Sequence, residues 1–243
     1  MKVDLVEFVC SAAGAGDLPD AGLVELAMVG RSNVGKSSLI NALFKRSVAR
    51  TSATPGKTRL LNVYRVVMRA TGTFYLVDLP GYGYAKKEAR GEFDRLAAMY
   101  FGRAAELPRD RWTVAGGHRS PITGHDRVPI GVLLALDARH PGMEPDLVTA
   151  RWLRDRQLDP LVVVNKIDKL TRSERPKALA RFGQLFGEPV LAVSAATGEG
   201  MEELWKQIVS RVASATQRRS QPLQAPAPEP RPPPPTPRPR FRA

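Results

Sequence analysis

Apolar residues form two kinds of pattern along the chain. Six short runs are continuously apolar or rich in β-branched residues, which predicts strands at residues 23–29, 61–67, 73–77, 130–136, 161–164 and 189–193. Five segments with helical spacing predict helices at residues 38–45, 91–101, 146–157, 173–186 and 201–213. Because strands and helices alternate, we expect an α/β fold with a mostly parallel six-stranded sheet, one antiparallel strand and helices on both faces.

Two segments interrupt this alternation. Residues 107–129 are rich in proline and glycine, which is typical of a long loop or insertion. Ten of the 21 prolines follow Ser220, and proline excludes both helix and central strand. We therefore expect one folded domain over residues 1–213 and a disordered tail rich in proline and arginine over residues 217–243.

The charge of the chain points to a polyanionic partner. Its 243 residues include 37 Lys and Arg against 24 Asp and Glu, a net charge of +13, which favours a nucleic acid or an anionic membrane face. Six arginines and Glu229 give the tail +5, which leaves +8 for the domain. Cys10 is the single cysteine, so no disulfide forms within the chain. With no apolar stretch long enough for a membrane span and no signal-peptide pattern, we expect a cytoplasmic protein.

A glycine-rich sequence follows the first predicted strand. Residues 30–37 read GRSNVGKS, which matches the phosphate-binding pattern G-x-x-x-x-G-K-[ST] between a strand and a helix. Such a loop turns its backbone N–H groups toward phosphates, at the positive end of the following helix. Lys36 is expected to reach the β- and γ-phosphates, and Ser37 to bind Mg²⁺. The candidate phosphate-binding residues here are Gly30, Arg31, Ser32, Asn33, Val34, Gly35, Lys36, Ser37 and Ser38.

A second motif follows the strand at residues 161–164. Asn165, Lys166, Ile167 and Asp168 form the pattern N-K-x-D, which in GTPases recognises guanine. The Asp168 carboxylate can accept both N–H donors that guanine presents and adenine lacks, and this discrimination is strong because unmatched buried polar groups are costly. The loop after the last predicted strand, with Val193, Ser194 and Ala195, is expected to support the base with a backbone N–H.

A third motif follows the strand at residues 73–77. Asp78, at the end of that strand, can hold Mg²⁺ through water, and the N–H of Gly81 can contact the γ-phosphate; Leu79 and Pro80 lie between them. The composition D-x-P-G is also common in simple turns. However, all these motifs follow predicted strands and occur in the order found in GTPases. They predict a Ras-like P-loop GTPase domain with its site at the carboxyl ends of the strands.

The chain resembles the EngB family, which consists of bacterial GTPases that act in assembly of the large ribosomal subunit. The resemblance covers about residues 8–212 and rests on five sequences: GRSNVGKSSL at 30–39, TSATPGKTR at 51–59, DLPGYGYA at 78–85, DARHP at 137–141 and SAATGE at 194–199. It implies a monomeric switch that binds GTP and GDP, hydrolyses GTP slowly, contacts a large-subunit precursor and its rRNA, and is needed for growth, division and septation.

The resemblance also assigns residue roles. It places Gly56, Lys57, Thr58, Arg59 and Leu60 in switch I, at the phosphates. Thr58 is implied to bind Mg²⁺ and, with Lys36 and Gly81, to act in catalysis; Thr54 is the alternative threonine. Tyr82 takes the position of the water-orienting glutamine of many signalling GTPases. Asn33 is implied to bind K⁺, which can substitute for an arginine finger.

The sequence departs from the family at three places. Position 165 is Asn where many members have Thr, the 107–129 stretch is longer than usual, and the tail is additional. An alternative function is a GTP-gated binding module of cell-division or membrane machinery with little catalysis; an ATP-dependent enzyme is opposed by Asn165 and Asp168. We expect the positive charge to contact RNA through residues in or beside the switches, namely Arg59, Lys86, Lys87 and Arg90.

Overall fold

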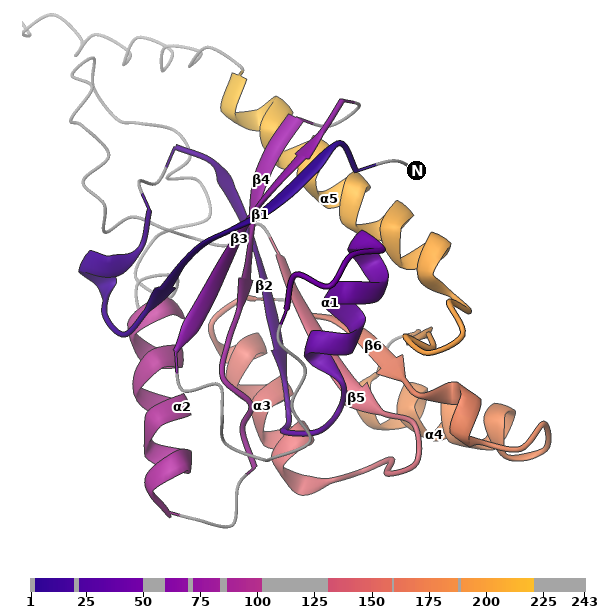
Figure 1. Cartoon of the computed structure of the whole chain (residues 1–243). Helices are drawn as coiled ribbons and strands as arrows, with labels where there is room; N and C mark the ends of the chain where they lie inside the picture. The colour runs from indigo at the N-terminus through magenta and orange to yellow at the C-terminus, as the bar shows by residue number, and fades with distance from the viewer. Residues whose placement is uncertain are drawn as a thin grey trace, which may run out of the picture.

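A seven-stranded sheet forms the centre of the computed structural model (Figure 1), which describes residues 3–19, 22–49, 60–69, 72–83, 87–101, 131–158, 160–187 and 189–220. The strands lie in the order β1-β3-β4-β2-β5-β6-β7, and β3 runs antiparallel to both of its neighbours while the other pairs are parallel. Their bounds are β1 (Leu5–Ala12), β2 (Val24–Gly30), β3 (Leu61–Met68), β4 (Gly72–Asp78), β5 (Gly131–Asp137), β6 (Pro160–Asn165) and β7 (Leu191–Ala192).

The mostly parallel sheet with one antiparallel strand is confirmed, but the expected count of six strands is wrong. The additional strand is β1, which pairs with β3 at the edge of the sheet. Several of its apolar residues are exposed, Phe8 by 53%. Because an edge strand needs no continuous apolar run, β1 lacks the pattern that reveals the buried strands. The last strand, β7, is also shorter than predicted.

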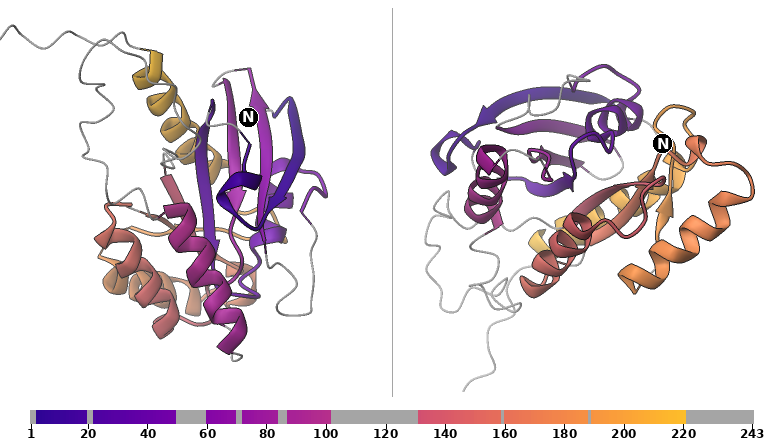
Figure 2. Two further views of the ribbon diagram at one scale, coloured as in Figure 1. Left: turned by 90° about the vertical axis from the view of Figure 1, so that its left-hand side faces the viewer. Right: turned by 90° about the horizontal axis from the view of Figure 1, so that it is seen from below.

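The helices lie on both faces of the sheet (Figure 2). The five predicted helices are present as α1 (Lys36–Phe44), α2 (Lys87–Phe101), α3 (Glu144–Asp155), α4 (Glu174–Phe186) and α5 (Met201–Ser220), with 3₁₀ turns η1 (Ala15–Asp17) and η2 (Ile167–Lys169). The last helix ends at Ser220 instead of residue 213, so it continues into the segment predicted as tail. The remainder of that segment and the 107–129 loop lie outside the described residues.

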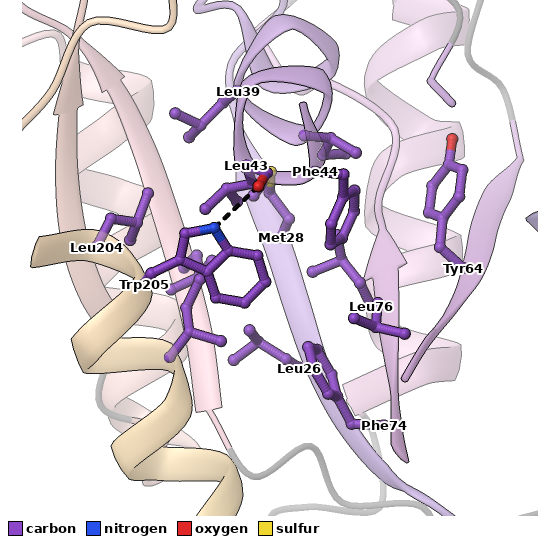
Figure 3. Close-up of a cluster of buried hydrophobic side chains, with 14 of the residues drawn as sticks. Leu26, Met28, Leu39, Leu43, Phe44, Tyr64, Phe74, Leu76, Leu204 and Trp205 are labelled. Atoms are coloured by element: carbon purple, nitrogen blue, oxygen red, sulfur yellow. Dashed lines mark hydrogen bonds between the residues drawn. The ribbon is translucent and has the colours of Figure 1, made fainter. Parts of the chain in front are cut away.

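Each face of the sheet packs against its own set of helices. Side chains of α1 and α5 meet one face, whereas α2, α3 and α4 cover the other. Neighbouring residues of β2 alternate accordingly, since Leu26 and Met28 point toward α1 and α5 while Ala27 and Val29 point the other way. Trp205 fixes α5 against α1, because its indole Nε1–H donates to the Leu43 carbonyl over 2.9 Å (Figure 3). These contacts hold α1, and with it the preceding loop, in place.

The pairing of the strands brings three predicted motifs to one edge. Met28 is opposite Asp78 in the β2–β4 pair, Gly30 is opposite Ala135 in the β2–β5 pair, and Asp137 is opposite Asn165 in the β5–β6 pair. The carboxyl ends of β4, β2, β5 and β6 therefore lie side by side, as expected for a ligand site in this class of sheet. Among the described residues, no helix is both long and apolar enough to cross a membrane.

Candidate functional site

The glycines of the phosphate loop stand where no larger residue fits. A Cβ atom on Gly30 would lie 2.6 Å from the Ala135 carbonyl oxygen, which is closer than real Cβ atoms come. Gly35 has φ +93°, and a Cβ atom there would lie 2.7 Å from Asn165 Nδ2. Gly35 is also the N-cap of α1, so the loop lies at the positive end of a helix. The local geometry is therefore that of an anion-binding loop.

Partly buried Lys36 and buried Asp78 carry opposite charges close to this loop. Lys36 Nζ donates to the Gly30 carbonyl over 3.2 Å. Burial lowers the pKa of Lys36, and the nearby Asp78 carboxylate opposes that shift. Burial likewise raises the pKa of Asp78 to about 6, against the opposing effect of Lys36. Each charged group therefore carries a desolvation penalty, and a ligand group of the opposite charge bound beside it would reduce that penalty.

Asp78 has the properties expected of a residue that holds a hydrated cation. Its Oδ1 atom is buried and receives no hydrogen bond from any described residue. Carboxylate oxygens suit Mg²⁺, which keeps several of its water molecules and binds one or two protein groups together with phosphates. Within the described part of the chain, no group of three or more His, Cys, Asp or Glu side chains forms a metal cluster. The donor set therefore fits a magnesium ion shared with a phosphate ligand.

The guanine motif is joined directly to the phosphate loop. The buried Asn165 side chain donates from Nδ2 to the Val34 carbonyl over 3.0 Å and accepts at Oδ1 from the Ala195 N–H over 3.1 Å. Lys166 Nζ donates to the Asn33 carbonyl. Asn33 and Lys166 both adopt positive φ, 63° and 68°, so the two loops approach each other in left-handed conformations. One amide side chain thus links three of the predicted motifs.

Asp168 and Ser194 form the outer part of this arrangement. Ser194 Oγ donates to Asp168 Oδ1 over 2.6 Å, and this hydrogen bond lowers the pKa of Asp168. Lys169 Nζ lies 3.4 Å from Asp168 Oδ2. The carboxylate is therefore ionised at neutral pH, which is the form able to accept two N–H donors from a base.

Asp137 is a site residue to which the sequence assigned no role. It ends β5, and its carboxylate accepts from Arg139 Nε over 2.9 Å, Arg139 Nη2 over 2.7 Å and Lys166 Nζ over 2.9 Å. Burial opposes ionisation, but these hydrogen bonds hold the pKa of Asp137 well below its usual value. Asp137 therefore orients Lys166 from beneath. Its place after an apolar strand, like that of Asp78, was the available sequence signal.

The switch residues are only partly described. Gly81 lies against the phosphate loop, because a Cβ atom there would be 3.0 Å from Ser32 N. Leu60 precedes β3, whereas Gly56, Lys57, Thr58 and Arg59 lie outside the described residues, as does the side chain of Arg90. Tyr82, which the resemblance places at the position of the water-orienting glutamine, is only 4% exposed, and its hydroxyl donates to Asp146 Oδ1 over 2.9 Å. Its side chain belongs to the core beside Phe93.

Comparison with known proteins decides the family. Residues 25–166 match the family described as "50S ribosome-binding GTPase". Two curated relatives carry the description "Probable GTP-binding protein EngB". The relative from Pelotomaculum thermopropionicum is 38% identical, and the match covers 86% of this chain and 96% of the relative. The relative from Thermotoga maritima is 39% identical, and the match covers 82% of this chain and 92% of the relative. The chain belongs to the EngB family of GTP-binding proteins.

Solved structures agree with the EngB fold. One described as a probable GTP-binding protein EngB superposes with a TM-score of 0.54 at 20% identity, covering 79% of this chain and all of the other. The Aquifex aeolicus Era structure bound to GDP and aluminium fluoride superposes with a TM-score of 0.58 at 22% identity, covering 77% of this chain and 56% of the other. The predicted P-loop GTPase fold is thereby confirmed, and membership of the EngB family makes the chain a GTP-binding, GTP-hydrolysing enzyme.

The buried Asp78 carboxyl predicts a pH-dependent effect of Mg²⁺. With a pKa of about 6, Asp78 is mostly ionised at pH 7.5 and mostly protonated at pH 5.5, where it no longer accepts hydrogen bonds from metal-bound water. We expect the gain in GDP affinity on adding Mg²⁺ to be several-fold smaller at pH 5.5. Fluorescence titration with labelled GDP, with and without Mg²⁺, measures this gain.

The Asp78→Asn variant provides the control, because the phosphates of GDP also titrate in this range. The variant retains the titration of the nucleotide but not that of Asp78, so its Mg²⁺-dependent gain should be small and should change less with pH. An equal pH effect in the wild type and in the variant would exclude Asp78 as the titrating group.

Proposed function

We propose that the chain is a magnesium-dependent GTP switch that assists assembly of the large ribosomal subunit in the cytoplasm and acts as a monomer. The observation that carries the nucleotide part is the Asn165 side chain, which joins the phosphate loop, the guanine motif and the 193–195 loop at one edge of the sheet. Normal growth, division and septation would depend on this assembly step. The alternative, a binding module of division or membrane machinery, is an outcome of the test below.

The proposed nucleotide contacts follow the strand ends. The N–H groups of residues 30–38 and the Lys36 ammonium would bind the phosphates, and Asp168 would accept from guanine while the Ala195 loop supports the base. Ser37 and Asp78 would hold Mg²⁺, Asp78 through water, with Thr58 as a further ligand. When bound, Mg²⁺ neutralises negative charge on the phosphates. We propose K⁺ at Asn33, an exposed residue of the phosphate loop.

The proposed hydrolysis is an in-line displacement at the γ-phosphate. A water oxygen forms a bond to phosphorus while the bond to the β-phosphate oxygen breaks, and the water proton leaves to phosphate or solvent. Lys36 and the Gly81 N–H would stabilise the charge that develops on the phosphate oxygens. The Tyr82 side chain is buried and its hydroxyl is bonded to Asp146, which supports a mechanism in which it does not orient the water. We therefore expect a slow intrinsic rate that a partner or K⁺ increases.

Substitution of Asp168 tests the guanine contact. The Asp168→Asn variant presents an amide where guanine requires a second acceptor, whereas xanthine offers a carbonyl that this amide can match. We expect GDP affinity to fall about a hundredfold, since two hydrogen bonds to a charged group are affected, and the affinity for xanthosine diphosphate to rise. Calorimetric titration with both nucleotides measures the change.

Asp155→Asn is the matched control, because it makes the same chemical change at an exposed position at the end of α3. It should leave both affinities unchanged. Unaltered GDP binding by the Asp168 variant, with no gain for the xanthine nucleotide, would show that Asp168 does not contact the base.

The ribosomal proposal is supported by two facts. The matching family is described as a 50S ribosome-binding GTPase, and the chain carries a net charge of +13. Contacts to rRNA phosphates release counterions, so binding through them weakens steeply as salt increases. The residues proposed to sense the switch state are Arg59, Lys86, Lys87 and Arg90, whose side chains lie outside the described part of the chain.

Sedimentation with large ribosomal subunits tests this proposal. We expect the full-length protein to pellet with the particles in the presence of a non-hydrolysable GTP analogue, to pellet less with GDP, and to be released as salt is raised. A full-length variant with Arg231, Arg238, Arg240 and Arg242 changed to Gln separates the tail from the domain. Binding that ignores both nucleotide and salt, or no binding to the particles, would contradict a switch on rRNA and favour the alternative partner class.

A further inference from the structure

Three polar side chains from separate elements meet beneath the phosphate loop. Arg31 belongs to the loop, Tyr82 directly follows Gly81, and Asp146 lies in the first turn of α3. The Tyr82 hydroxyl donates to Asp146 Oδ1 over 2.9 Å, and Arg31 Nε lies 3.5 Å from the same oxygen. We call these three residues the Asp146 cluster. One carboxylate oxygen therefore contacts both the phosphate loop and the residue that directly follows Gly81.

The Asp146 cluster is buried at a cost in free energy. Asp146 is 2% exposed and Tyr82 is 4% exposed. Within the described residues, buried Asp146 Oδ2 accepts no hydrogen bond and buried Arg31 Nε donates none; Arg31 Nε has only the long contact to Asp146 Oδ1. Incompletely satisfied buried charges add little to stability, and apolar residues of similar volume often serve a core as well. The cluster is therefore a poor candidate for a purely stabilising contact.

Backbone hydrogen bonds place Gly81 between two fixed contacts, one on each side of it in the sequence. The Leu79 N–H donates to the Met28 carbonyl over 3.0 Å, and the Ser32 N–H donates to the Tyr82 carbonyl over 2.9 Å. Arg31 and Tyr82 also form a parallel bridge. Gly81 lies between these two anchors, and a Cβ atom on it would be 2.9 Å from Ser32 Oγ. Tyr82 directly follows Gly81, so its buried side chain fixes the backbone next to Gly81.

We propose that Asp146 is a positioning residue for the γ-phosphate contact. Through Tyr82 and Arg31 it holds Gly81 against the rim of the phosphate loop, where the Gly81 N–H meets the third phosphate of GTP. This inference rests on the proposed nucleotide contacts and goes beyond them, because it assigns a role to a helix α3 residue that touches no ligand. GDP lacks the third phosphate, so its binding does not depend on the position of Gly81.

The test compares two nucleotides in the full-length protein. Affinities for labelled GDP and for a labelled non-hydrolysable GTP analogue are measured by fluorescence for the wild type, Tyr82→Phe and Asp146→Ala. We expect affinity for the GTP analogue to fall about tenfold in both variants, as for the loss of one hydrogen bond to a charged group, while GDP affinity stays within about twofold. Asp146→Asn, which keeps an acceptor oxygen for Tyr82, should restore most of the affinity.

A matched control comes from a second buried tyrosine and carboxylate. The Tyr100 hydroxyl donates to Glu25 Oε2 over 2.9 Å in the same hydrophobic cluster, at residues separate from the phosphate loop. Tyr100→Phe removes the same atom and should change both affinities equally or not at all. Thermal unfolding measures whether each variant is folded. If Asp146→Ala does not fold, Tyr82→Phe still provides the test, because it retains the buried aromatic ring.

The outcomes distinguish this inference from the proposed function. If the wild type binds neither nucleotide, the proposed nucleotide contacts fail. If the wild type binds both but Tyr82→Phe lowers both affinities equally, lowers neither, or behaves as Tyr100→Phe does, the positioning role of Asp146 is overturned.

Discussion

The Asn165 side chain is the contact on which the geometry of the site depends. It donates to a carbonyl of the phosphate loop and accepts from the N–H of the 193–195 loop, so one amide fixes three segments that are far apart in the sequence. The contact is possible because β2, β5 and β6 are neighbours and end at the same edge. It also explains why residue 35 is glycine, since a Cβ atom there would collide with this amide. These hydrogen bonds join residues of the chain itself, so the Asn165 amide holds the three segments together.

The charged residues of the site are buried at a cost in folding stability. Lys36 and Asp78 are both shifted by burial toward their neutral forms, and Asp78 Oδ1 lacks a partner among the described residues. Asp137, by contrast, is fully supported by Arg139 and Lys166. One buried carboxylate without a partner thus lies where phosphate and metal are proposed to bind, whereas the satisfied carboxylate of Asp137 orients Lys166. This division is expected if ligand binding supplies the missing interactions.

The sequence predicted the parts of the structure that have strong local patterns. Buried strands produce continuous apolar runs, and the loops GRSNVGKS and NKID have fixed spacing, so both were found where the structure places them. Strand β1 was missed because its edge position lacks such a run. The roles of Asp137, Asp146 and Tyr82 depend on tertiary contacts: an aspartate in the first turn of a helix ordinarily only complements the helix dipole, and nothing local shows that Tyr82 turns into the core.

The central claim is that Asn165 holds the phosphate loop in place in the absence of nucleotide. Hydrogen–deuterium exchange of the nucleotide-free protein tests it most directly, by comparing the amides of residues 31–36 in the wild type and in Asn165→Ala. The account predicts slow exchange in the wild type and clearly faster exchange in the variant, with the distant helix α2 unchanged. Equal exchange of the loop in both proteins would contradict it.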